Sequence, residues 1–139
     1  MDILDASDKL NWISQRILAS EKEIPRPVDA ETVIEITQKI LNSKLAELRG
    51  DTKERRRLEE EASVDMAGIQ ALFDLDKSGL LDQLYKEILT RIDIIYSDDE
   101  LEVSKKQVAL EELAAVIDEI RVDMMNTDEE AITALAGLD

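Results

Sequence analysis

Apolar residues recur at intervals of three and four along most of this chain, and this spacing constrains its fold more than any other feature. Near the N-terminus the series runs through Ile3, Ala6, Leu10, Ile13 and Ile17. Such a series places its side chains on one face of an α-helix. The alternation that marks a strand between hairpin turns is not sustained anywhere in the sequence. The sequence therefore predicts an all-α protein.

Turn and capping signals divide the apolar series into separate helices. The segment IPRP at 24–27 should follow a first helix that ends near residues 21–23. Asp29 is then placed to cap a second helix and Asp51 to cap a third. A turn at 74–79 should separate the third helix from the fourth, with Ser78 as the cap.

Two further capping boxes lie in the last third of the chain. SDDE at 97–100 should open the longest helix, and TDEE at 127–130 should open a short one. We therefore expect an antiparallel bundle of about five helices over residues 1–126. A short acidic and apolar tail helix should follow over residues 127–139.

The chain contains neither histidine nor cysteine. This excludes serine–histidine triads, thiolate nucleophiles and the usual zinc sites. A magnesium-dependent hydrolase would need paired carboxylates on facing helices, and only weak pairs such as Asp99 and Glu102 occur. We therefore predict a non-catalytic protein without a cofactor, and keep the carboxylate and magnesium hydrolase as an alternative.

The segment from Asp74 to Tyr85 resembles an EF-hand loop. Its candidate cation ligands are Asp74, Asp76, Ser78 and Asp82, with Gly79 at the turn position. Position 12 of such a loop holds a glutamate that gives two oxygens, and here it is Tyr85. We interpret the segment as a turn between helices, with weak cation binding as the alternative.

Negative charge is concentrated in the last third of the chain. The formal net charge is −16, and residues 97–139 hold thirteen acidic side chains against Lys105, Lys106 and Arg121. Such a field repels nucleic acid and anionic membranes and attracts a basic protein surface. No apolar run approaches the length of a membrane span, and the N-terminus lacks a basic and apolar signal segment. We therefore expect a cytoplasmic protein with a basic protein partner and without direct binding to nucleic acid or membrane.

The last helices carry more large aliphatic side chains than one small bundle readily covers. A surplus of this kind predicts an interface with a partner helix or with a second copy, so a homo-oligomer is expected. The protein would act as an adaptor, an assembly factor or an inhibitor of a larger machine. The predicted partner-binding residues are Leu101, Val108, Leu113, Ile117, Ile120, Met124, Ile132, Leu135 and Leu138.

Carboxylates flank this stripe and should form an acidic rim that sets partner choice. An alternative is that they imitate DNA phosphates and block a nucleic-acid-binding protein. The predicted rim consists of Asp98, Asp99, Glu102, Glu111, Glu112, Asp118, Glu119 and Asp123.

Two smaller features have competing interpretations. Trp12 lies beside Ile13 in the first stripe, so partial burial is expected, with an exposed interface anchor as the alternative. The basic run at 55–57 could grip phosphate or an acidic partner. Glutamates stand four residues after each arginine, which favours a solvated helix face.

Overall fold

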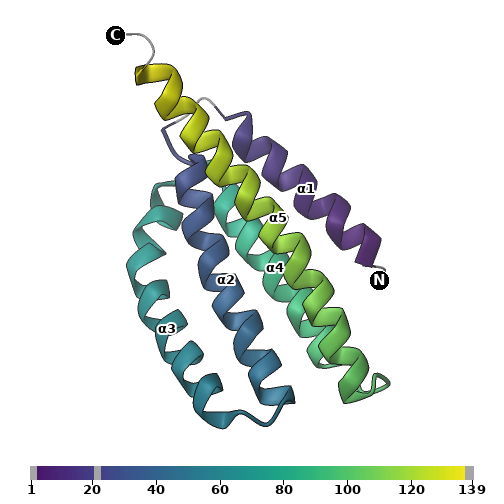
Figure 1. Cartoon of the computed structure of the whole chain (residues 1–139). Helices are drawn as coiled ribbons and strands as arrows, with labels where there is room; N and C mark the ends of the chain where they lie inside the picture. Colours follow the sequence, from purple (N-terminus) through teal and green to yellow (C-terminus); the bar gives the residue numbers. More distant parts are fainter. Residues whose placement is uncertain (1–2, 21–22, 137–139) are drawn as a thin grey trace.

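The computed structural model is all-α in the part of the chain that it describes, with no strand there. It describes the backbone of residues 3–20 and 23–136, and the side chains of residues 9–20 and 23–127. The helices are α1 (Ile3–Leu18), α2 (Pro27–Leu48), α3 (Thr52–Leu75), α4 (Leu80–Tyr96) and α5 (Val103–Ala136). Each runs antiparallel to the one before it (Figure 1), which confirms the predicted all-α antiparallel bundle of about five helices.

Four of the helices enclose the core, and α3 lies outside these four. Helices α1, α2, α4 and α5 pack around a common interior that contains Leu10, Ile34, Leu84 and Ile117, all fully buried. Helix α3 contributes only Leu58, Ala62 and Ile69 to the buried set, and it packs mainly along α2 (Figure 1). The α2–α3 hairpin therefore leaves α5 free to form one edge of the bundle.

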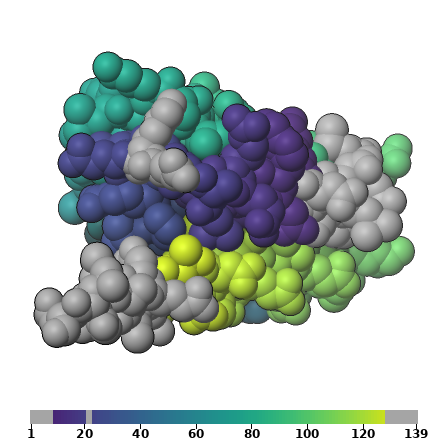
Figure 2. All heavy atoms as spheres, turned by 90° about the horizontal axis from the view of Figure 1, so that it is seen from above, coloured from purple at the N-terminus to yellow at the C-terminus, as the bar shows by residue number. Residues whose placement is uncertain are grey.

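Helix α5 lies along that edge for most of its length. Figure 2 shows it beside α1, with α3 on the opposite side of the molecule from α5. Its inward face carries Leu110, Leu113, Ile117, Ile120 and Met124, which are buried. The opposite face of the same helix is in solvent.

Several predicted boundaries are confirmed and others are wrong. Asp51 caps α3 as predicted, because its Oδ1 accepts a hydrogen bond of 3.1 Å from the backbone N–H of Glu54. Asp29 is not the cap of α2. It lies one turn inside, where its Oδ2 accepts a bond of 2.9 Å from the N–H of Arg26.

The two capping boxes of the last third do not start helices. Helix α5 begins at Val103, because Asp98 makes a local turn in which its Oδ1 accepts from the N–H of Glu100 at 2.9 Å. At Thr127 the helix continues without a break to Ala136, so the predicted separate tail helix is wrong. The Thr127 hydroxyl donates to the carbonyl of Asp123 at 2.9 Å instead of capping a new helix.

Candidate functional site

The structure divides the predicted partner-binding stripe between the core and the surface. Leu113, Ile117, Ile120 and Met124 are buried in the bundle, so they are not available to a partner while it is folded. Leu101 is half-buried in the loop before α5, and Val108 is 55% exposed. The side chains of Ile132, Leu135 and Leu138 lie outside the described residues.

Helix α5 carries a second apolar line that faces away from the core. Val108, Ala115 and Val122 are exposed and stand seven residues apart, which is about two helical turns. We call this line the outer α5 stripe. Val108 lies five residues from Leu113, a rotation of about 140° around the helix, and this separates the stripe from the core face.

The sequence prediction placed Val108 in one partner-binding stripe with residues that prove to be buried, and it did not include Ala115 and Val122. The signal that could have found them is the seven-residue spacing, which is a different register from the three- and four-residue spacing of the core face. Val122 is 45% exposed. The stripe therefore presents one valine to solvent about two helical turns before Ala115 and another about two turns after it.

Carboxylates stand on both sides of the outer α5 stripe. Glu111, Glu112, Asp118, Glu119 and Asp123 are all exposed. Glu111 forms an ion pair with Arg49 on α2, with Nη2 and Oε1 3.0 Å apart. The other four make no ion pair with any residue whose side chain the structure describes.

The rest of the predicted acidic rim lies before α5. Asp98 is half-buried in its own turn, and Asp99 and Glu102 are exposed. Of the three basic side chains of α5, Lys105 is exposed, and the other two are turned away from the rim. Lys106 donates to the carbonyl of Tyr96 at 2.7 Å, and Arg121 turns toward Glu35 on α2 at 2.6 Å. The exposed face of α5 is therefore apolar along its middle and negative along its sides.

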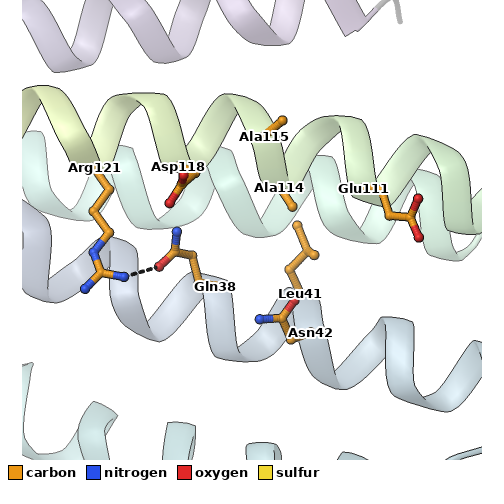
Figure 3. Close-up of a pocket in the computed structure, with 8 residues that line it drawn as sticks. All are labelled: Gln38, Leu41, Asn42, Glu111, Ala114, Ala115, Asp118 and Arg121. Carbon is orange, nitrogen blue, oxygen red and sulfur yellow. Dashed lines mark hydrogen bonds between the residues drawn. The ribbon is translucent and has the colours of Figure 1, made fainter.

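A groove runs between α5 and α2 next to this face (Figure 3). It has a volume of about 480 Å³, and it is lined by Gln38, Leu41, Asn42, Glu111, Ala114, Ala115, Asp118 and Arg121. The groove exists because Ala114 faces Leu41 where α5 approaches α2, and its short side chain leaves the space between the helices unfilled. Gln38 and Leu41 extend from α2 toward α5, and Ala115 lies at the rim (Figure 3).

The turn at 74–79 uses its polar groups within the fold. Asp76 is buried and accepts from the N–H of Ser78 at 3.1 Å and from the N–H of Leu81 at 2.8 Å. Asp76 rather than Ser78 is therefore the main cap of α4. Gly79 has a φ of +72°, a conformation that side chains disfavour.

The other predicted cation ligands also have contacts within their own helices. Asp74 accepts from the Gln70 amide at 3.5 Å, and Asp82 pairs with Lys86 at 2.9 Å. Among the described residues, no group of three or more acidic side chains is arranged to hold a metal ion. Cation binding at this turn stays an untested alternative.

Trp12 is exposed, so the expected partial burial is wrong. It is 55% exposed on the solvent face of α1, and the Arg16 guanidinium lies 5.3 Å from its ring centroid. In the basic run, Arg56 and Arg57 are solvent-exposed, as expected, whereas Arg55 is half-buried beside α2. Arg57 pairs with Glu54 and with Glu61, and Arg55 pairs with Glu47 on α2 at 3.5 Å.

Comparisons with known proteins give no relative for this chain. No protein-family model matches it, no curated protein is significantly similar to it, and no solved structure is significantly similar to its fold. Among the described residues, no helix is both long enough and apolar enough to cross a membrane. The functional proposal therefore depends on the geometry of the surface.

Proposed function

We propose that this chain is a non-catalytic protein that binds a basic protein partner through the outer α5 stripe and the carboxylates beside it. The single observation that supports this is the surface of α5. One side of the helix is already used in the core, and the other presents apolar side chains between carboxylates, of which only Glu111 has an ion pair with a residue whose side chain is described. Interfaces of this kind join an apolar centre to a charged rim.

The charge of α5 favours a basic partner over a second copy of the chain on this face. A two-fold interface places the same patch of each copy opposite itself. Glu112 and Glu119 of one copy would then face equivalent carboxylates of the other, and like charges in contact oppose association. The homo-oligomer predicted from the sequence would have to use another part of the surface.

Paired variants test this proposal. Val108→Gln with Val122→Gln removes both exposed valines of the stripe without changing charge. The matched control is Val64→Gln with Leu75→Gln on α3, where the two side chains are 73% and 61% exposed. Each tagged protein is used to capture partners from a lysate of its native source, and the captured proteins are identified and quantified.

The stripe variant should lose a basic partner that the wild type and the α3 variant both retain. Equal capture by all three proteins would contradict the proposal. Addition of duplex DNA distinguishes the DNA-mimic alternative from an ordinary protein interface. A mimic would be displaced from a DNA-binding partner by duplex DNA at low salt, whereas an ordinary protein interface would not.

A further inference from the structure

The groove between α2 and α5 has an apolar floor and polar groups at both ends. Leu41 and Ala114 form the floor, and Ala115 lies at the rim. At one end Arg121 donates to the Gln38 side-chain oxygen at 3.0 Å and to Glu35 at 2.6 Å. At the other end lies the ion pair between Glu111 and Arg49. The groove is therefore a bounded pocket that fits side chains better than a whole helix, because 480 Å³ is at the small end of ligand pockets.

The charges around the groove leave it negative. Arg121 already faces two carboxylates, those of Glu31 at 3.8 Å and Glu35 at 2.6 Å. Arg49 is matched by Glu111. Asp118 has no ion pair with a described residue, and Figure 3 shows it opposite the Gln38 amide across the groove. One carboxylate thus remains without a cation at the middle of the pocket.

A long basic side chain matches both properties of this pocket. Lysine and arginine lay an aliphatic stem along apolar surface and keep the charged end at a polar site. A stem of this kind fits the Leu41 and Ala114 floor, and the cation would then reach Asp118. Charge-assisted hydrogen bonds to a carboxylate are stronger than neutral ones.

We infer that the α2–α5 groove binds a lysine or arginine side chain from a basic segment of the partner protein, with Asp118 as the carboxylate that pairs with it. This inference rests on the proposed function and names the contact that would select a basic partner. The outer α5 stripe lies beside the groove, since Ala115 belongs to both. A partner on the stripe could therefore place a side chain in the pocket.

A blocked Ala-Arg-Ala-Arg-Ala peptide serves as the probe, titrated at low ionic strength into the full chain labelled with ¹⁵N. Asp118→Asn removes the carboxylate charge and keeps the shape of the side chain. Asp123→Asn is the matched control, because it makes the same change in net charge at an exposed site of α5 outside the groove.

Asp118→Asn should weaken peptide binding by about threefold to tenfold, and Asp123→Asn by less than about twofold. Backbone signals of residues that line the groove, such as Gln38 and Ala115, should shift most in the wild type. Equal weakening by both variants would overturn the inference, because binding would then follow total charge alone.

A second pair of variants tests whether the peptide needs the open volume of the groove rather than its charge. Ala115→Leu narrows the mouth of the groove at a position that is exposed in the free protein, so the fold should be kept. It should abolish most peptide binding, whereas Ala67→Leu on the exposed face of α3 should not change it. If Ala115→Leu still binds the peptide, or if the wild type does not bind it detectably, the inference that the groove binds a basic side chain is overturned. The capture experiment with the Val108→Gln and Val122→Gln variant tests the proposed function independently of the groove.

Discussion

At the scale of single residues, Leu113 and Val108 show how one helix serves both the core and the surface. Leu113 is 3% exposed and Val108 is 55% exposed, although both belong to the same apolar-rich segment. Leu113→Ala should lower the free energy of unfolding by about 2–5 kcal/mol, because it leaves a cavity in a packed core. Urea unfolding followed by circular dichroism measures this change.

Val108→Ala is the comparison for that prediction. It should change the free energy of unfolding by less than about 0.5 kcal/mol, as expected for a surface site. An equal loss in the free energy of unfolding at the two positions would show that the core and outer faces of α5 are assigned incorrectly. The contrast also explains why polar substitution of Leu113 would not test partner binding cleanly, since it would disturb the fold first.

Asp76 carries the turn between α3 and α4. Asp76→Ala removes the acceptor for the N–H groups of Ser78 and Leu81, and it should lower the free energy of unfolding by about 1–2 kcal/mol. Asp74→Ala is the control, because Asp74 is exposed and should cost less than about 0.5 kcal/mol. A calorimetric heat with millimolar calcium that Asp76→Ala abolishes would instead support the cation-binding alternative.

At the scale of helices, an ion-pair network centred on the buried Glu87 of α4 reaches α1. Arg91 and Glu87 stand one turn apart on α4 with Nη2 and Oε1 2.7 Å apart, and their side chains are 7% and 10% exposed. Lys9 of α1 reaches the other oxygen of Glu87 at 3.2 Å. The contact between these helices therefore depends on matched charge as well as on apolar packing.

Glu87→Gln should lower the free energy of unfolding by about 1–3 kcal/mol, because it removes the carboxylate charge that both Arg91 and Lys9 contact. Asp82→Asn on the same helix is the control. It breaks an exposed pair with Lys86 and should cost less than about 1 kcal/mol. An equally small loss of stability for both variants would contradict a stabilising role for the Glu87 charge.

Much of the helix arrangement could be predicted from the sequence, because apolar periodicity and the Asp51 cap are local signals. The binding surface could not. Which side of α5 faces the core depends on how α1, α2 and α4 pack around it, and no local pattern contains that information. Trp12 shows the same limit, since its exposure depends on which face of α1 packs against α4 and α5.

At the scale of the whole molecule, charge and shape combine on one edge. The chain has a net charge of −16, and the described part of α5 presents exposed carboxylates along its outer face. A basic partner should therefore associate faster at low ionic strength and bind more weakly as salt is added. Stopped-flow association rates with the captured partner would measure this. A rate that does not change with salt would argue against an electrostatic role for the acidic rim.

The most direct test of the account is site-specific photo-crosslinking in native lysate. A photoreactive residue replaces Ala115, at the junction of the outer α5 stripe and the groove, and in a second protein it replaces Val64 on the exposed face of α3. The account predicts an abundant adduct from position 115 to a protein with a basic contact segment, reduced by added salt, and little from position 64. Equal adducts from both positions, or an adduct from position 115 to an acidic segment, would contradict it.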